Sequence, residues 1–202
     1  DRQPVCPGCR EVRATHRHAI PDELRQAVHE LIRRPAASLD QIGDLDIQLG
    51  RLFAETAQKL LIRSGLRASD VRAIGSHGQT VRHHPAGAHP FTIQLGNPSV
   101  IAELTGITTV ADFRMRDVAA GGQGAPLAPA FHAVQFRSGA RNRAILNLGG
   151  IANLTCLPAD TGKPVIGFDT GPGNTLLDQW IARHSNERYD RDGRWAERGK
   201  LS

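Results

Sequence analysis

The sequence lacks any long apolar run. No stretch of about 18 consecutive apolar residues occurs, the length that a membrane-spanning helix needs, so we expect no membrane partner. The residues from Asp1 to Pro4 are polar, and the N-terminal region has no apolar segment of the kind found in a secretory signal peptide. Both absences favour a cytoplasmic protein.

The chain is also poor in cysteine, with three in 202 residues. A small, odd number argues against a disulfide scaffold and fits a reducing cytoplasm. Cys6 and Cys9 have the spacing of half a zinc knuckle, but a structural zinc site needs four ligands, and only His16 and His18 lie nearby. An incidental cysteine pair is the favoured interpretation, and no metal site is predicted.

Aromatic residues make up only 4% of the chain. Proteins that bind single-stranded nucleic acid stack bases on aromatic side chains, and too few are present here. The net charge is +5 and the isoelectric point about 9.7, but most arginines are scattered singly, apart from the pair Arg33 and Arg34. We therefore expect no nucleic-acid partner, and a diffuse positive field that helps to attract an anionic substrate.

The hydrophobic pattern changes along the chain. Apolar residues recur at helical spacing over 21–35 and 39–65. After Asp70, short β-forming runs alternate with turns and helices, which is typical of an α/β sheet. We expect strands at 71–76, 91–95 and 107–111, helices at 99–104 and 129–136, and a loop at 112–124. A run of small residues at 121–125 predicts two domains, 1–124 and 125–202.

Two β-forming runs end in glycine-rich turns that carry asparagine, from Ala144 to Asn153 and from Val165 to Asn174. Glycine lets backbone N–H groups come close to an anion. The second turn leads into a helical segment from Thr175, whose N-terminus favours negative charge. We therefore predict a phosphate site. Its candidate residues are Asn147, Gly149, Gly150, Asn153, Gly171, Gly173 and Asn174.

Asp169 is the lone carboxylate of the second turn, at the position where its strand is expected to stop. Phosphoryl transfer needs one carboxylate to orient or deprotonate the attacking oxygen, so Asp169 is the candidate catalytic base. Two simpler interpretations stay open. Asp169 would cap the next turn through an Asx bond, and Asn147 to Gly150 would be an ordinary hairpin connection.

Polar residues of the first domain are candidates for binding a substrate. Arg114 and Arg116 lie two residues apart on a segment that we expect to be extended, so their side chains would point the same way. A pair of guanidinium groups suits a carboxylate or a phosphate; the alternative is a surface ion-pair cluster with the neighbouring aspartates. The tentative substrate-binding set is His77, Gln79, Asp112, Arg114, Arg116 and Gln123.

Seven motifs occur in a fixed order between Val71 and Lys200. They are Ala73-Ile-Gly-Ser-His-Gly-Gln-Thr80, Gln94-Leu-Gly-Asn97, Ala111-Asp-Phe-Arg114, Asp117-Val-Ala-Ala-Gly-Gly-Gln-Gly-Ala-Pro126, Asn147-Leu-Gly-Gly150, Gly167-Phe-Asp-Thr-Gly-Pro-Gly-Asn174 and Tyr189-Asp-Arg-Asp-Gly193. In this order and spacing the chain resembles the anhydro-N-acetylmuramic acid kinases, bacterial enzymes of the hexokinase and actin-like ATPase superfamily.

The resemblance implies a ribonuclease H-like, actin-like ATPase fold with two lobes and a cleft between them. Residues 1–124 would form most of the N-terminal lobe, without its first strands, and residues 125–202 would begin the second lobe. The implied enzyme is a sugar kinase that opens the 1,6-anhydro ring of its amino sugar with water. It transfers the γ-phosphoryl group of ATP to O6, giving N-acetylmuramic acid 6-phosphate for peptidoglycan recycling.

The resemblance also implies roles for single residues. Asp169 matches the catalytic aspartate, which would activate the water that attacks the anomeric carbon. The turn from Asn147 to Asn153 resembles the second phosphate loop of the superfamily, and Mg²⁺ would bind largely through ATP. Arg114 and Arg116 would face the sugar or its lactyl carboxylate. The family also suggests a homodimer.

One family motif is missing from the sequence. Family members begin with a strand and a Gly-Thr-Ser-x-Asp-Gly-x-Asp loop that contacts the phosphates of ATP, and no such motif occurs here. We expect the chain to be an internal piece of a longer kinase, which alone binds ATP poorly and does not turn over. Two other interpretations stay open: a kinase of the same superfamily with another sugar substrate, and a non-catalytic sugar-binding remnant.

Overall fold

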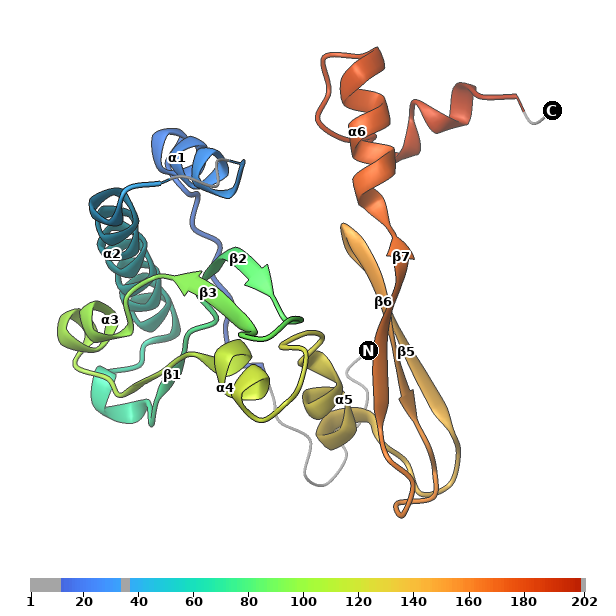
Figure 1. Ribbon diagram of the computed structural model, residues 1–202, viewed down its shortest axis with the longest axis horizontal. Helices are drawn as coiled ribbons and strands as arrows, with labels where there is room; N and C mark the ends of the chain where they lie inside the picture. Colours follow the sequence, from blue (N-terminus) through green and yellow to red (C-terminus); the bar gives the residue numbers. More distant parts are fainter. Residues whose placement is uncertain (1–11, 34–36, 201–202) are drawn as a thin grey trace. The chain divides into compact units, whose positions relative to one another are not determined.

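A computed structural model describes residues 12–33 and 37–200, so Cys6 and Cys9 lie outside the described residues (Figure 1). The chain divides into two compact units, the first ending at Gly124 and the second beginning at Ala125. Both contain helices and short strands, and the chain is of the mixed α/β class. None of the helices within the described ranges combines the length and the apolar character that crossing a bilayer requires.

The core of unit 1 is built on two helices, α1 (Asp22–Arg33) and α2 (Leu39–Ser64), which confirm the predicted helical segments. The Ser38 hydroxyl caps α2 by accepting from the N–H of Gln41, and Gly65 ends it in the left-handed conformation. The apolar faces of both helices pack together with strand residues. The buried core is Leu24, Val28, Leu31, Leu45, Leu49, Leu52, Val81 and Leu95.

Two small sheets complete unit 1. Strand β1 (Ile74–Gly75) pairs in parallel with β4 (Thr109–Val110), and β2 (Gln79–His84) pairs antiparallel with β3 (Phe91–Leu95). The strand predicted at 91–95 is confirmed, whereas β1 and β4 are shorter than predicted. A 3₁₀ turn, Ala68–Asp70, precedes the predicted first strand and is closed by the Val71 N–H donating to the Ala68 carbonyl, and residues 71–73 form no regular structure before β1.

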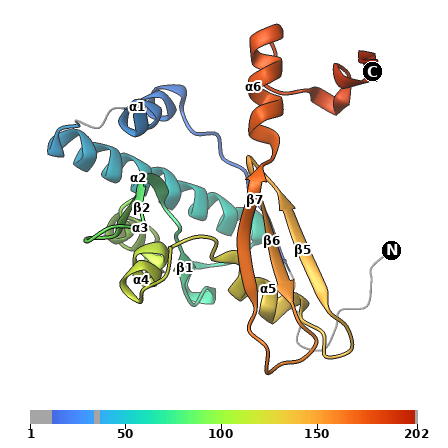
Figure 2. The same ribbon diagram turned by 45° about the vertical axis from the view of Figure 1, so that its right-hand side comes forward.

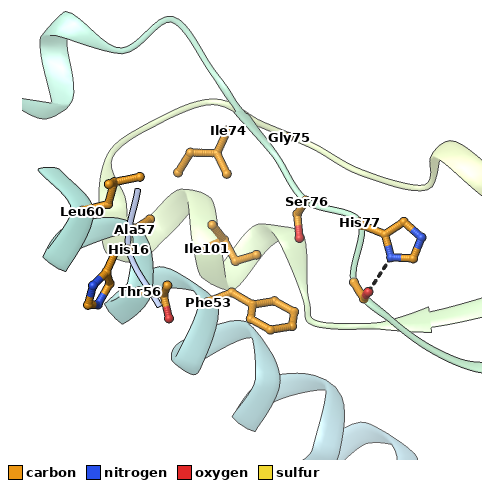
Figure 3. Close-up of a pocket in the computed structure, with 11 residues that line it drawn as sticks. His16, Phe53, Thr56, Ala57, Leu60, Ile74, Gly75, Ser76, His77 and Ile101 are labelled. Atoms are coloured by element: carbon orange, nitrogen blue, oxygen red, sulfur yellow. Dashed lines mark hydrogen bonds between the residues drawn. The ribbon is translucent and has the colours of Figure 1, made fainter. Parts of the chain in front are cut away.

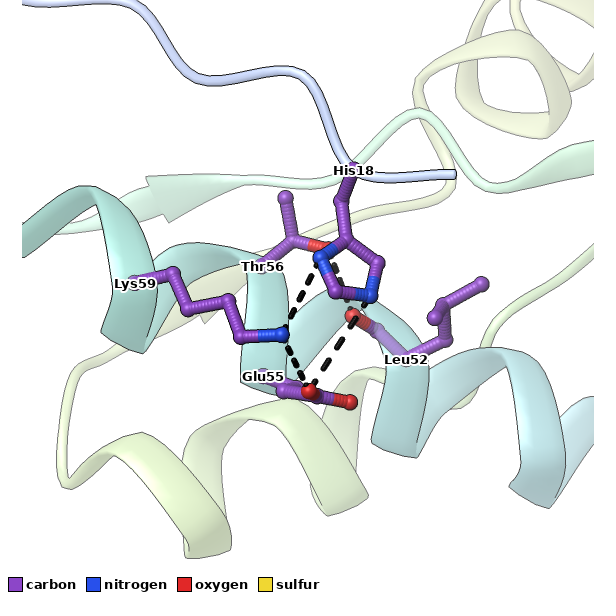
Figure 4. Close-up of polar contacts among 5 residues, drawn as sticks. All are labelled: His18, Leu52, Glu55, Thr56 and Lys59. Atoms are coloured by element: carbon purple, nitrogen blue, oxygen red, sulfur yellow. Dashed lines mark hydrogen bonds and ion pairs between the residues drawn. The ribbon is translucent and has the colours of Figure 1, made fainter. Parts of the chain in front are cut away.

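Residues 12–20 have no regular secondary structure and lie against α2. The Lys59 ammonium donates to both Glu55 and the His18 Nδ1, as Figure 4 shows. The hydrogen bond that Lys59 donates to Glu55 holds the pKa of the Glu55 carboxyl below its usual value. Arg63 donates to the Nδ1 of His16 at 2.8 Å, and burial together with this cation lowers the pKa of His16. This segment is therefore fastened to the C-terminal half of α2 by polar contacts.

The turn from β3 into α3 (Pro98–Thr105) is fastened to α2 by one carboxylate. Asp46 accepts hydrogen bonds from the Gly96 N–H and the Asn97 Nδ2, each at 2.8 Å. The other end of the Asn97 amide caps α3 by accepting from Ser99 and Val100. The motif from Gln94 to Asn97 therefore has a clear structural role.

We expect Asp46→Ala to destabilise unit 1 by about 1–3 kcal/mol, because two buried or half-buried donors lose their acceptor. Urea unfolding followed by circular dichroism measures the loss. Asp44→Ala, at an exposed position on the same helix, is the matched control for helix propensity and charge. Equal stability of the two variants would contradict the role given to Asp46.

The prediction of a loop at 112–124 is wrong over its first half, where α4 (Phe113–Ala119) forms. Asp112 precedes it in the left-handed conformation, with φ of 59°. Arginine, methionine and alanine are good helix formers, and Val118 is buried, so the segment gains more by forming a helix than by staying extended. Residues two apart on a helix point in nearly opposite directions. Arg114 and Arg116 therefore do not form a pair.

Unit 2 is a three-stranded antiparallel sheet with two helices. Strands β5 (Arg143–Leu148), β6 (Ile151–Leu157) and β7 (Ile166–Pro172) lie side by side in that order, and α6 (Asn174–His184) follows β7 (Figures 1 and 2). Helix α5 (Ala128–Phe136) packs on the sheet through the contact of His132 with Thr155, at 2.9 Å. Two 3₁₀ turns, Arg191–Gly193 and Ala196–Arg198, end the described chain.

Candidate functional site

Three polar side chains form a row across the sheet of unit 2. Asn147 on β5 is the register partner of Asn153 on β6, and Asn153 is the partner of Asp169 on β7. Directly opposed residues of antiparallel strands project from the same face, with Cβ atoms about 4.5–5.5 Å apart. The pairing therefore gathers two carboxamides and one carboxylate on one face. All three residues were predicted as site residues, but strand ends rather than strand register were expected to bring them together.

Asp169 lies within a strand rather than at its end, which corrects the expected position. Strand β7 continues to Pro172, and a bulge at Thr170 shifts the register between Asn153 and Ala152. The Thr170 hydroxyl ties the bulge down by donating to the Ala152 carbonyl at 3.1 Å. The Asp169 side chain is exposed, and its carboxylate makes no hydrogen bond or ion pair with the residues that the structure describes. Nothing in this part of the chain competes for its oxygens.

The two glycine turns do come together. The Gly149 carbonyl accepts from the Asn174 N–H at 2.8 Å, and the Gly150 carbonyl accepts from the N–H groups of Gly173 and Thr175 at 2.9 and 3.3 Å. Asn174 also donates from its side chain to the Leu148 carbonyl. The hairpin between β5 and β6 is thus clamped to the start of α6.

Close approach explains two of the glycines. A Cβ at Gly173 would lie 2.3 Å from the Gly149 carbonyl oxygen, and one at Gly150 would lie 2.8 Å from the Thr175 hydroxyl. The N–H groups at the start of α6, which were expected to face an anion, donate in this structure to the carbonyl groups of the hairpin.

In unit 1 the structure joins two of the predicted substrate residues. The Arg114 Nε donates to the His77 Nε2 at 2.9 Å, and its Nη1 donates to the Gly124 carbonyl at 2.8 Å. Arginine has no acceptor, so His77 Nε2 must be unprotonated and its Nδ1 carries the proton. That Nδ1 lies 2.7 Å from the Gly78 carbonyl and donates to it. His77 is therefore held by two hydrogen bonds, one at each ring nitrogen.

The remaining substrate candidates do not join this pair. Arg116 is exposed and makes no side-chain hydrogen bond within the described residues. Gln79 donates to the backbone of its neighbour Thr80, and Gln123 is exposed in the loop after α4. Asp112 precedes α4 without capping it through its side chain. Of the predicted set, only His77 and Arg114 are held in contact.

A cavity of about 330 Å³ borders this region of unit 1. Figure 3 shows His16 and His77 at opposite ends of the cavity, with Ser76 close to His77. Its walls are mostly apolar, from Phe53, Leu60, Ile74 and Ile101. The Nε2 of His16 is buried there and has no hydrogen-bond partner among the described residues. Because His77 also contacts Arg114, the cavity adjoins the predicted substrate residues.

The candidate set omitted Asp117, although the structure connects it to Arg114. Asp117 accepts from the Gly124 N–H at 2.7 Å, and Gly124 in turn accepts from Arg114. The spacing of three residues between Arg114 and Asp117 would have placed them on one helix face. This spacing was not used as evidence because the segment was expected to be extended rather than helical.

No candidate metal centre emerges from the described residues, in which no three His, Cys, Asp or Glu side chains gather closely enough to hold an ion. Asp169 is a single carboxylate beside two carboxamides. Mg²⁺ in kinases is commonly bound by one or two carboxylates together with substrate phosphates. This donor set therefore fits a magnesium ion that arrives with a nucleotide.

Comparison with protein families matches residues 8–202 to the model for anhydro-N-acetylmuramic acid kinase. The chain belongs to this family. It is 55% identical over 188 residues to the anhydro-N-acetylmuramic acid kinase of Coxiella burnetii, a match that covers 93% of the chain and 50% of the relative. The Xylella fastidiosa kinase is 56% identical over 193 residues, covering 95% and 50%, and that of Saccharophagus degradans 50% over 188 residues, covering 92% and 50%.

The chain thus spans about half the length of the curated relatives it matches. Identity of 50–56% over nearly the whole chain means that the resemblance is not confined to the glycine-rich motifs. The family membership predicted from the seven motifs is confirmed. The activity belongs to the longer relatives, and its extension to this chain is taken up next.

Proposed function

We propose that the protein containing this chain is an ATP-dependent kinase that hydrolyses and phosphorylates 1,6-anhydro-N-acetylmuramic acid. In this reaction the oxygen of water bonds to C1, the bond between C1 and O6 breaks, and O6 takes the γ-phosphoryl group. ADP and N-acetylmuramic acid 6-phosphate are the products. The family match and the open carboxylate of Asp169 in its row with Asn147 and Asn153 support the proposal.

In this proposal Asp169 is the catalytic base. Its exposed carboxylate has no competing partner within the described chain, so it is open to accept the proton of the attacking water. The neighbouring Asn153 carries both an amide donor and a carbonyl acceptor, and its place beside Asp169 suits it to orient that water. Asp169 takes up the proton of the attacking water as the C1–O6 bond breaks.

The hairpin that connects β5 and β6 would bind the phosphates of ATP. Asn147, Gly149, Gly150 and Asn153 form or flank this hairpin, and the contacts from Gly173 and Asn174 hold it rigid. Gly171, in β7 with φ of 141°, adapts the strand to the bulge beside Asp169. Mg²⁺, held largely by the phosphate oxygens, would neutralise their negative charge.

Unit 1 would supply the groups that bind the sugar. Arginine has five N–H donors, and Arg114 uses one on His77 and one on Gly124, so three remain without a partner among the described residues. A half-buried guanidinium with three open donors suits the lactyl carboxylate of the substrate. Weaker contacts with the sugar are proposed for the other candidates of unit 1, which are Gln79, Asp112, Arg116 and Gln123.

The proposal extends to the whole protein. We infer a two-lobed fold of the ribonuclease H-like, actin-like ATPase type, in which residues 1–124 belong to the N-terminal lobe and residues 125–202 to the second. We also propose a homodimer acting in the cytoplasm. Family membership supports each of these statements.

The 202-residue chain alone should bind ATP weakly and show no turnover. It spans half the length of its relatives and contains no Gly-Thr-Ser-x-Asp-Gly motif for the phosphates. Isothermal titration calorimetry with ATP and, separately, with the anhydro sugar tests this expectation. Heat of binding with the sugar alone would show that the sugar site is preserved. Conversion of the anhydro sugar by the purified chain would refute the expectation.

A further inference from the structure

We propose that Asp117 is a positioning residue that holds Arg114 for the substrate by anchoring the loop from Gly121 to Gly124. The proposal rests on the function given above, in which Arg114 binds the lactyl carboxylate. Asp117 makes no hydrogen bond or ion pair with Arg114 in the described structure; it acts through Gly124. The N–H of Gly124 donates to the Asp117 carboxylate, and the carbonyl of the same residue, in the next peptide group, accepts from Arg114.

Asp117 anchors the loop at two points. Its Oδ2 accepts from the Gly124 N–H at 2.7 Å, and its backbone carbonyl accepts from the Gly122 N–H at 2.9 Å. A Cβ at Gly122 would lie 2.2 Å from Asp117 Oδ2, so the loop backbone folds directly onto the carboxylate. A hydrogen bond to an ionised acceptor is roughly twice as strong as one between neutral groups.

Gly124 is a rigid support for Arg114. It is buried and has a φ of 70°, a conformation that glycine adopts without strain. A Cβ there would lie 3.0 Å from Val118 and 3.4 Å from His83, so the residue is packed on both sides. Its N–H donates to Asp117, its packing restricts its backbone, and its carbonyl accepts from Arg114 Nη1.

The second support of Arg114 is independent of Asp117. The Arg114 Nε–H donates to the Nε2 of His77, whose Nδ1 lies within hydrogen-bond distance of the Gly78 carbonyl. Two supports at different atoms fix both the position and the plane of the guanidinium. Loss of one leaves a group that can rotate about the other, so the three open donors no longer present a fixed fork to a carboxylate.

The test compares Asp117→Ala with Asp117→Asn in the 202-residue chain. Asparagine keeps an acceptor oxygen of the same reach, whereas alanine removes it. Hydrogen exchange of the Arg114 Nε–H, measured by ¹H–¹⁵N NMR and assigned by its loss in Arg114→Lys, reports whether the guanidinium is held. We expect exchange about tenfold faster in Asp117→Ala, and a smaller increase in Asp117→Asn, whose amide oxygen is a weaker, neutral acceptor. Asp44→Asn, at an exposed carboxylate on α2, serves as the control.

Gly122→Ala perturbs the same anchor from the other side, because the added methyl group must displace the Asp117 carboxylate. It should speed Arg114 exchange as Asp117→Ala does, with the circular dichroism spectrum unchanged. Unchanged Arg114 exchange in both Asp117→Ala and Gly122→Ala would overturn the proposal. Exchange of the Arg114 Nε–H that is equally fast in Asp117→Asn and Asp117→Ala would also overturn the proposal. It would show that the charge of Asp117 matters and not its anchoring oxygen.

A binding measurement separates this proposal from the proposed function. Calorimetry compares 1,6-anhydro-N-acetylmuramic acid with 1,6-anhydro-N-acetylglucosamine, which lacks the lactyl carboxylate. We expect the chain to prefer the first sugar, and Asp117→Ala to reduce that preference about tenfold. If neither sugar binds, the sugar site is not preserved in this chain, while the exchange data still decide whether Asp117 positions Arg114. A preference that Asp117→Ala leaves intact would overturn the positioning role.

Discussion

Asp169→Asn should lower the turnover number of a full-length kinase that contains this segment by about 10²- to 10⁴-fold, the range typical for loss of a general base. Asparagine matches the carboxylate in size and fits the same place in the row beside Asn153. It cannot accept the proton of the attacking water. Because Asp169 makes no hydrogen bond to the rest of the described chain, the change should leave stability nearly unaltered. Steady-state kinetics with the anhydro sugar measures the effect.

The split between kcat and KM sharpens this test. Loss of the base acts in the transition state, so kcat should fall while the KM for ATP stays within about threefold. Asp178→Asn, on α6 and without a part in the proposed site, is the matched control and should retain full activity. Near-normal turnover of Asp169→Asn would contradict the role of Asp169 as the catalytic base.

Gly96→Ala should have the largest effect on stability, a loss of about 2–4 kcal/mol from overpacking and backbone strain. Gly96 is buried with φ of 120°, a conformation that residues with a side chain rarely adopt. An added Cβ would also lie 2.4 Å from Cε2 of Phe53, whose ring packs against the core. Urea unfolding monitored by circular dichroism gives the free energy of unfolding.

Gly43→Ala is the matched control for Gly96→Ala and should change stability in the opposite direction. Gly43 is exposed within α2, and a Cβ there meets no atom within 4 Å. Alanine in a helix interior is more favourable than glycine by about 0.5–1 kcal/mol. A loss of stability in Gly43→Ala, or none in Gly96→Ala, would show that the assigned backbone environments are wrong.

Local signals predicted much of the fold. The periodic apolar residues predicted helical segments at 21–35 and 39–65, close to the observed bounds of α1 and α2. The pair of glycines at 149–150 marked the hairpin between β5 and β6. In both cases the deciding interactions join residues close in sequence, and such interactions are visible in a sequence pattern.

The errors occur where distant residues decide the structure. The segment from Asp112 to Gly124 alternates charges as an exposed loop would, but burial of Val118 and packing of α4 against β3 favour a helix. Likewise β7 passes Asp169 because Gly171 and Pro172 still pair with β6. Neither partner can be read from the segment itself.

The candidate site shows the same division. Asp169, Asn147 and Asn153 were identifiable by residue type and by the family motifs, but their alignment depends on the register of three strands. The glycines of the two turns were predicted for phosphate binding. The structure gives Gly150 and Gly173 a packing role as well, since a side chain at either would collide with the opposite turn.

In the proposed reaction, water opens the sugar ring while ATP phosphorylates O6. The most direct test runs the full-length kinase in H₂¹⁸O, reduces the product at once with borohydride to stop exchange at C1, and locates the label by mass spectrometry. We expect one ¹⁸O on C1 and none in the phosphoryl group. Label in the phosphoryl group, or a phosphorylated product whose 1,6-anhydro ring is still closed, would contradict it.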